Sequence, residues 1–181
     1  MPLPSASKIL HDGHAVLRAR WYLRHATEVG DRVRLWGTPT ISNRGTFKVG
    51  DRVRLVSTVT RLEIAVGPDA TLEIGESTFI NHGCSIGVTQ HVRIGANCSI
   101  GPQVYIMDND FHRLEPDRRN ELPPSLPIVL EDNVWLAARV TVLPGVTIGA
   151  GSVIGASSVV VRDVPPRSLA AGVPARVIRN L

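Results

Sequence analysis

The chain has 181 residues, of which 43% are hydrophobic, 4% aromatic and 20% charged, and its formal net charge is +4. This length allows one domain with a sizeable core, and the scarcity of aromatic side chains suits a narrow interior filled by Val, Ile and Leu. Eighteen of the 20 basic residues are arginine. No basic run with interleaved aromatic residues is present, which argues against nucleic-acid binding and favours a phosphate-bearing small molecule as partner.

The N-terminal segment and the cysteines indicate the cellular compartment. The segment contains Pro2 and Pro4 and has no apolar stretch as long as a signal peptide or a membrane span. Cys84 and Cys98 form neither a CxxC motif nor an even disulfide framework. Each lies four residues after an aliphatic residue of the repeat described below, which predicts a small buried thiol. We therefore expect a reduced, cytoplasmic protein.

Residues 7–26 are predicted to form a helix with an apolar stripe and neighbouring arginines. The stripe consists of Ile9, Leu10, Val16, Leu17, Trp21 and Leu23. A basic amphipathic helix can lie on a membrane surface. More often, such a segment covers the edge strands at the open end of a repeat array. We expect residues 1–28 to form a helical cap, and contact with a membrane surface is the less favoured alternative.

The rest of the chain repeats with a short period. The heptapeptide VGDRVRL occurs at 29–35 and again at 49–55. In the C-terminal part, one aliphatic residue recurs every six positions: Leu130, Leu136, Val142, Ile148, Ile154 and Val160. This period is neither that of a helix nor that of a strand, and it is typical of a parallel β-helix whose coils bury their aliphatic residues against one another. The sequence predicts an all-β solenoid over residues 29–181.

Two segments interrupt the rhythm. Residues 56–73 are less regular and contain the turn residues Gly67-Pro68-Asp69, so we expect an expanded coil in which Ile64 and Leu72 keep the aliphatic ladder. The ladder stops at Ile106, and the polar segment 107–127 predicts a loop inserted at a coil corner. Loops of this length tend to be functional. The last residues are expected to form a short final strand that closes the C-terminal end.

The segments EDNVWLAARVTVLPGVTIGAGSVIGASSVVVRDVPP and AAGVPARVIR resemble the C-terminal part of the hexapeptide-repeat acyltransferases. The resemblance is strongest to the sugar O-acetyltransferase branch, which includes the galactoside and maltose acetyltransferases. A looser match runs from about Leu72 through the loop histidine. The resemblance implies a left-handed parallel β-helix, a homotrimer, and acetyl-CoA as a co-substrate bound in grooves between subunits, with no metal required.

The loop carries the histidine best suited to catalysis. Acyl transfer from a thioester to a hydroxyl needs one base that titrates near neutrality, which is the property of histidine. His112, within DNDFHRL, occupies the place of the family's general base. A solvated loop histidine is the alternative. Asp108 and Asp110 are close enough in sequence to orient the imidazole, although either can serve as a turn residue instead.

The resemblance also assigns substrate and cofactor contacts. Asn81 corresponds to the residue that positions the acceptor, Trp135 lies near both acceptor and cofactor, and the backbone N–H of Ala138 is placed to stabilise an oxyanion. The remaining cofactor contacts are Ala156, Arg162, Arg176 and Arg179, the last two at the nucleotide end of CoA. As alternatives, Asn81 is an outward polar residue, Trp135 is a subunit contact, and each arginine is solvated surface.

These features predict an acyl-CoA-dependent O-acetyltransferase that modifies a sugar hydroxyl by direct attack in a ternary complex, in bacterial surface polysaccharide or glycolipid synthesis. An N-acetyltransferase acting on an amino sugar or a xenobiotic is the main alternative. A γ-class carbonic anhydrase needs three histidines around one metal, and the chain lacks a close histidine pair after His112. A non-catalytic solenoid is the last alternative.

Overall fold

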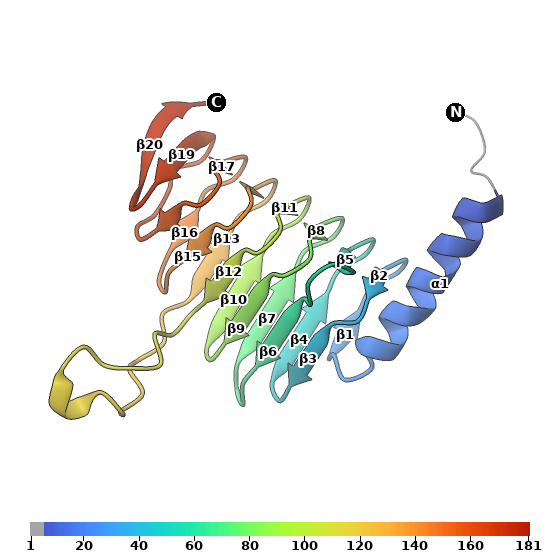
Figure 1. Ribbon diagram of the computed structural model, residues 1–181, viewed down its shortest axis with the longest axis horizontal. Coiled ribbons are helices and arrows are strands. Elements are labelled where there is room, and N and C mark those ends of the chain that lie inside the picture. The colour runs from blue at the N-terminus through green and yellow to red at the C-terminus, as the bar shows by residue number, and fades with distance from the viewer. Residues whose placement is uncertain (1–5) are drawn as a thin grey trace.

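The computed structural model describes residues 6–181, with side chains from residue 13 onward. One helix, α1 (Ala6–Tyr22), is followed by a solenoid of three parallel sheets (Figure 1). Sheet A contains β1 (Glu28–Val29), β4 (Thr46–Val49), β7 (Thr71–Ile74), β10 (His91–Ile94), β13 (Ile128–Leu130) and β16 (Thr147–Ile148). Sheet B contains β2 (Arg34–Gly37), β5 (Arg54–Ser57), β8 (Phe79–Ile80), β11 (Ser99–Ile100), β14 (Trp135–Leu136), β17 (Val153–Ile154), β19 (Ser168–Gly172) and β20 (Ala175–Asn180). Sheet C contains β3 (Thr40–Asn43), β6 (Glu63–Val66), β9 (Ser85–Val88), β12 (Tyr105–Met107), β15 (Thr141–Val142) and β18 (Val159–Val160).

Each coil of the solenoid visits sheet A, then B, then C, and each strand pairs in parallel with the strand of the same sheet in the next coil. The exception is the C-terminal pair β19–β20, which is antiparallel. This arrangement confirms the predicted parallel solenoid with an N-terminal helix and one inserted loop. It agrees with the left-handed β-helix that the resemblance implies.

The six-residue period follows from this geometry. Successive ladder residues fall in different sheets, so every third unit stacks on the same column of the interior. In sheet B the column runs through Leu35, Leu55, Ile80, Ile100, Leu136 and Ile154, all of them buried. Burying one such side chain contributes roughly 1.5–3 kcal/mol. The stacked columns form one continuous core along the solenoid.

The expanded coil is also confirmed. Leu35 pairs with Leu55, an offset of 20 residues, whereas Ile41 pairs with Ile64, an offset of 23. The additional residues lie in the turn between β5 and β6, where the Ser57 hydroxyl accepts a hydrogen bond from the Leu62 N–H (2.9 Å). The ladder therefore continues after an enlarged turn.

The prediction for the N-terminal helix is partly wrong. α1 ends at Tyr22 and packs near β2, and its Ala15 and Ala19 are buried together with Leu23 in the turn that follows. Leu17 and Trp21, which were assigned to the packing stripe, are 64% and 65% exposed. Small alanine side chains let the helix lie close to the first coil, and the bulkier side chains then face away from it.

Ile9 and Leu10, the other two predicted members of the stripe, lie outside the residues whose side chains are described. The division of the chain into a cap (1–28) and a solenoid domain (29–181) stays a prediction. No helix in residues 6–181 is long and apolar enough to cross a membrane.

Two further details concern the C-terminus and the cysteines. The chain ends in a hairpin of two strands, β19 and β20, where a single short final strand was expected. Cys84 and Cys98 are buried and unpaired, as predicted. Burial raises the pKa of the Cys84 thiol to about 11 and also raises the pKa of Cys98.

The stacked column gives a first testable prediction. Ile100→Ala removes a fully buried side chain between Ile80 and Leu136, and the free energy of unfolding should fall by roughly 2–5 kcal/mol. The matched change Ser99→Ala, at the exposed neighbouring position, should stay within about 0.5 kcal/mol of the parent. Urea titration followed by circular dichroism measures both, and equal effects at the two positions would contradict the stacked core.

Candidate active site

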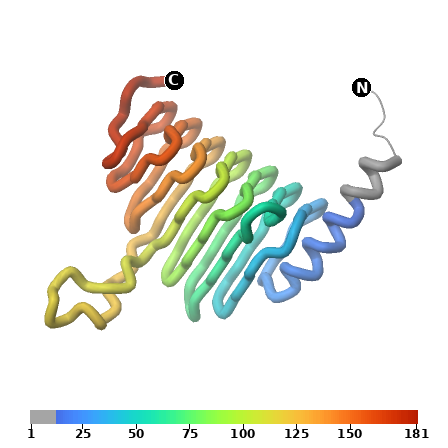
Figure 2. The backbone as a smooth tube through the Cα atoms, in the orientation of Figure 1, coloured from blue at the N-terminus to red at the C-terminus, as the bar shows by residue number. Residues whose placement is uncertain are grey.

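The inserted loop leaves the solenoid at the edge where sheet C turns into sheet A, between β12 and β13, and we call this the C–A edge. The loop protrudes from the coils and contains one short 3-10 turn, Pro116–Arg118 (Figure 2). The edge where sheet B turns into sheet C is called the B–C edge. These two edges carry different parts of the predicted site.

A buried carboxylate fixes the start of the loop. Asp108 is fully buried, and its carboxylate accepts hydrogen bonds from Thr89 N–H and Oγ1–H (both 2.8 Å), Gln90 N–H (2.7 Å) and His91 N–H (2.8 Å). These donors lie at the same edge in the preceding coil. Hydrogen bonds to a charged group each contribute about 1.5–3 kcal/mol net to the stability of the folded state. Asp108 therefore anchors the loop, and its hydrogen bonds do not involve the His112 imidazole.

A second set of hydrogen bonds joins the two ends of the loop. The Asn109 amide donates to the Pro123 carbonyl oxygen and to Ser125 Oγ (both 2.9 Å), and Ser125 Oγ lies 2.6 Å from Thr89 Oγ1. We call Thr89, Asp108, Asn109 and Ser125 the loop clasp. The clasp holds together the two segments at which the chain enters and leaves the loop. The base of the loop is therefore fixed relative to the solenoid.

His112 lies on the loop just beyond this clasp. The Asn109 side chain accepts a hydrogen bond from the Phe111 N–H (2.6 Å), which fixes the turn before the histidine. His112 Nδ1 lies 2.9 Å from the carbonyl oxygen of Arg119. Because a carbonyl oxygen can only accept, Nδ1 carries a proton, and in the neutral imidazole the lone pair is then on Nε2. The exposed imidazole is thus set up as a base at Nε2.

Ion pairs within the loop hold its outer part. Glu121 Oε2 lies 2.7 Å from Arg118 Nη2 and 3.3 Å from Arg113 Nε. The hydrogen bond from Arg118, with the nearby Arg113 charge, holds the pKa of Glu121 below its ordinary value. These pairs are solvent-exposed and contribute little to stability individually, but they link both sides of the segment that carries His112.

A largely apolar cavity of about 470 Å³ opens at the base of the loop. Its wall consists of Tyr105, Met107, Asn109, Asp110, Phe111 and the segment 141–144. Phe111 precedes His112, so the cavity lies beside the candidate base. It offers an apolar surface of the kind that small-molecule sites use.

Three of the predicted contact residues lie at the B–C edge. Asn81 follows β8, Ala138 follows β14 and Ala156 follows β17. Among the described residues, no acceptor is bonded to the Ala138 N–H. The Nδ1 atom of His82, next to Asn81, is buried and has no hydrogen-bond partner within the described part of the chain. Of these two groups, the Ala138 N–H is the one that a molecule bound at this edge could satisfy.

A cavity of about 390 Å³ lies close to the same edge. It is lined by Thr60, Gly83, Gln103, Tyr105, Arg139 and Thr141. Arg139 follows Ala138 directly and donates from Nε to Gln103 Oε1 (3.0 Å). The sequence did not single out these residues, because they come together only through the stacking of successive coils.

The remaining predicted contacts lie elsewhere. Trp135, 52% exposed, projects from the outer face of sheet B. Arg162 is at the C–A edge after β18, and it lines a cavity of about 140 Å³ together with Arg176 and Asp163. Arg179 is on β20, opposite Leu169. The C-terminal hairpin therefore brings two of the three predicted arginines together.

The structure does not bring the histidine and the B–C edge residues together within one chain. His112 projects from the C–A edge, whereas Asn81, Ala138 and Ala156 line the next edge of the three-sided solenoid. No hydrogen bond or ion pair joins His112 to any of these three residues in the described chain. One copy presents two halves of the predicted site on two different edges.

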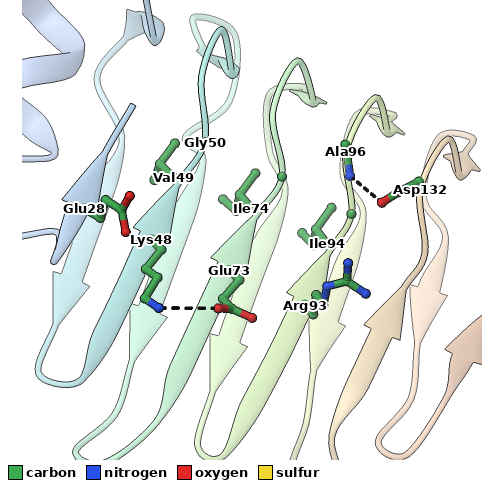
Figure 3. A pocket seen from close by; sticks show the side chains of 12 residues that line it. Glu28, Lys48, Val49, Gly50, Glu73, Ile74, Arg93, Ile94, Ala96 and Asp132 are labelled. Carbon is green, nitrogen blue, oxygen red and sulfur yellow. Dashed lines mark hydrogen bonds and ion pairs between the residues drawn. The ribbon is translucent and has the colours of Figure 1, made fainter. Parts of the chain in front are cut away.

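Another cavity, of about 370 Å³, lies over sheet A (Figure 3). The first four strands of sheet A present outward residues of alternating charge, in the order Glu28, Lys48, Glu73 and Arg93. Lys48 forms an ion pair with Glu73 at 3.7 Å. These charges compensate one another, and none of the predicted site residues lines this cavity. We do not assign it a catalytic role.

Metal-dependent alternatives receive no geometric support. Within the described part of the chain, no three His, Cys, Asp or Glu side chains are grouped so that they could hold a metal ion. The described residues of one chain therefore contain no cluster of three histidines of the kind that a γ-class carbonic anhydrase requires.

Comparisons with known proteins agree with the fold and with the resemblance. Residues 127–162 match the family described as bacterial transferase hexapeptide (six repeats). The galactoside O-acetyltransferase of Escherichia coli is 40% identical over 112 residues, which is 62% of this chain and 55% of the relative. The C-terminal repeats of the chain are thus similar to those of the hexapeptide-repeat transferases. The chain spans about half the length of the curated relatives it matches first.

Two solved structures extend the comparison. A hexapeptide-repeat acetyltransferase of Vibrio cholerae, in complex with acetyl coenzyme A, has a TM-score of 0.66 and 29% identity and covers 98% of this chain and 90% of its own. A galactoside acetyltransferase in complex with coenzyme A has a TM-score of 0.57 and 32% identity and covers 82% and 66%, respectively. The likeness thus includes the N-terminal coils as well as the C-terminal repeats.

The loop clasp yields a prediction that needs no substrate. Asp108→Asn puts an amide donor against backbone N–H donors, so the loop should detach from the preceding coil. Trypsin should then cut more rapidly at Arg113, Arg118 and Arg119, as measured by mass spectrometry of timed digests. The matched control is Asp110→Asn, at an exposed position of the same loop. Equal cleavage rates in the two variants would contradict the clasp.

Proposed function

We propose that the protein is an acyl-CoA-dependent O-acetyltransferase that transfers an acetyl group to a hydroxyl of a sugar. The observation that supports this most is the His112 imidazole, whose Nδ1 bonds to the Arg119 carbonyl oxygen and leaves Nε2 free. The similarity to the galactoside O-acetyltransferase of Escherichia coli supports a sugar acceptor. Acetyl-CoA as co-substrate is supported by the V. cholerae relative, which was solved in complex with it.

In the proposed mechanism, His112 Nε2 removes the proton of the acceptor hydroxyl as its oxygen attacks the thioester carbon. The carbonyl oxygen becomes an oxyanion, and the Ala138 N–H is the candidate donor to it. Collapse of the tetrahedral intermediate breaks the carbon–sulfur bond, and the imidazolium returns the proton to the CoA thiolate. The products are the acetyl ester and free CoA, and no covalent enzyme intermediate is formed.

The other proposed contacts hold the two substrates. Asn81 and Trp135 are assigned to the acceptor, and Trp135 also contacts the acyl-CoA. Ala156 lines the cofactor groove. Arg162, Arg176 and Arg179 bind the phosphates and nucleotide of CoA, since guanidinium groups match phosphate geometry. The cavity shared by Arg162 and Arg176 supports this role, although Asp163 also lines it.

We further propose that the active site forms between copies of the chain in a homotrimer. The support is the separation of the two halves of the site, because His112 projects from the C–A edge and Asn81, Ala138 and Ala156 line the B–C edge. Three three-sided solenoids arranged around an axis can place the C–A edge of each copy beside the B–C edge of the next. Each trimer then has three equivalent sites.

We also propose a compartment and a pathway for this reaction. An acetyl-CoA donor favours a cytoplasmic reaction, and a saccharide acceptor fits bacterial surface polysaccharide or glycolipid synthesis. An amine acceptor remains the alternative, because an N-acetyltransferase can use the same base and the same donor. An acceptor panel that contains matched sugars and amino sugars distinguishes the two reactions.

The catalytic proposal is tested by the release of free CoA thiol from acetyl-CoA in the presence of that panel. His112→Ala should lower acceptor-dependent release by at least about 100-fold, since general-base catalysis contributes that much or more. The control is His91→Ala, at a half-buried histidine of sheet A. Retention of most activity in His112→Ala would remove this residue from the mechanism.

The intersubunit proposal is tested by mixing two inactive variants. His112→Ala and Asn81→Ala damage different halves of the site, so mixed trimers should contain some intact sites and regain part of the wild-type rate. Trimers that carry both changes in every chain have no intact site and serve as the control. If mixed trimers stay as inactive as the single variants, the two halves belong to one chain.

A further inference from the structure

The outer face of α1 is unusual for a helix that packs on a solenoid. Ala15 and Ala19 are buried on its inner face, as is Leu23 just after it, whereas Leu17 and Trp21, one turn apart, are 64% and 65% exposed. The guanidinium of Arg24 lies 4.8 Å from the Trp21 ring centroid, and its Nη1 donates to the Trp21 carbonyl oxygen (2.8 Å). An exposed aromatic residue with an arginine over it combines an apolar body with a charged tip.

A cavity of about 240 Å³ lies between this helix and the first turn of the solenoid. Three arginines line it, Arg20 and Arg24 from the helix side and Arg32 from the turn, together with apolar residues that include Val16. Asp31 is the one acidic residue in the lining. Arg20 and Arg32 have no hydrogen-bond or ion-pair partner among the described residues. The cavity thus offers unpaired cations next to the exposed apolar face.

The charge of the chain is concentrated at this end. Residues 1–62, which contain α1 and the first coils, have 11 Lys and Arg against 4 Asp and Glu, whereas residues 63–181 have 9 against 12. The formal charges of the two parts are therefore +7 and −3. An excess of positive charge at the end that contains α1 indicates that this end is attracted to an anionic surface.

We propose that α1 and the adjoining cavity dock the protein on an anionic membrane surface. Arg20, Arg24 and Arg32 bind lipid phosphates, and Leu17 and Trp21 enter the interface between head groups and acyl chains. Tryptophan and arginine are the side chains that favour this layer. If the proposed trimer aligns its solenoids, all three helices lie at the same end and bind together, and lipid-linked saccharides become the acceptors nearest the site.

The charge of the face argues for lipid over a second copy of the chain. Pairing two such faces would bring Arg20, Arg24 and Arg32 of each copy against the same arginines of the other, which is repulsive. An anionic bilayer supplies both the opposite charge and an apolar layer for Leu17 and Trp21. Docking on it satisfies both features of the face at once.

The test is co-sedimentation of the full chain with vesicles at low ionic strength. Wild-type protein should sediment with vesicles of equal parts phosphatidylglycerol and phosphatidylcholine and stay in solution with pure phosphatidylcholine. The paired change Arg20→Gln and Arg32→Gln should weaken binding by at least about tenfold, since each basic residue near an anionic surface adds to the attraction. The paired change Leu17→Gln and Trp21→Gln should weaken it comparably.

The matched control is Arg93→Gln with Arg139→Gln, which removes the same charge at sheet A and at the B–C edge. It should bind like the wild type, and circular dichroism shows whether each variant is folded. The proposal is overturned if the wild type ignores phosphatidylglycerol, if it binds both vesicles equally, or if the control loses as much binding as the helix variants. A smaller mass for Leu17→Gln/Trp21→Gln in light scattering would also overturn it, because the face would then be a subunit contact.

Discussion

Stacking of inward-facing aliphatic side chains from one coil onto the next is the interaction on which the whole structure depends. No coil can bury its own apolar residues, so stability comes from the columns that run through neighbouring coils. In sheet B this column extends from Leu35 to Ile154 without a polar residue. The stack also fixes the edges of the solenoid, and every candidate functional residue of the loop and of the turns is placed relative to those edges.

The candidate functional groups lie on two different edges of the solenoid. One edge carries a loop whose base is held by Asp108 and Asn109 and whose imidazole is oriented by the Arg119 carbonyl oxygen. The next edge carries Asn81 and Ala138, whose N–H has no acceptor among the residues that the structure describes. Local motion of the solenoid cannot bring together the proposed base and the proposed oxyanion donor, because they lie on different edges. We therefore propose that association of copies completes the site.

Much of the fold could be predicted from the sequence. The six-residue period and the duplicated VGDRVRL indicate the coils, and the gap in the period after Ile106 indicates the inserted loop. The packing face of α1 could not be predicted, since a helical stripe does not reveal that Ala15 and Ala19 outcompete Leu17 and Trp21 for the close contact. The clasp was also missed. Thr89 lies 19 residues before Asp108, and only the coil register brings them together. The role of His112 remains a prediction that its geometry supports.

The most direct test of the intersubunit site is a cross-link between its two edges. Native Cys84 and Cys98 are buried, so thiols introduced at Asp110→Cys, near His112, and at Ala156→Cys can be joined by a short thiol-reactive reagent. The two single variants are co-expressed and treated in their assembled form. The account predicts a covalent dimer with one chain of each kind. Absence of this dimer, in protein that still assembles and binds acetyl-CoA, would contradict a site shared between neighbouring chains.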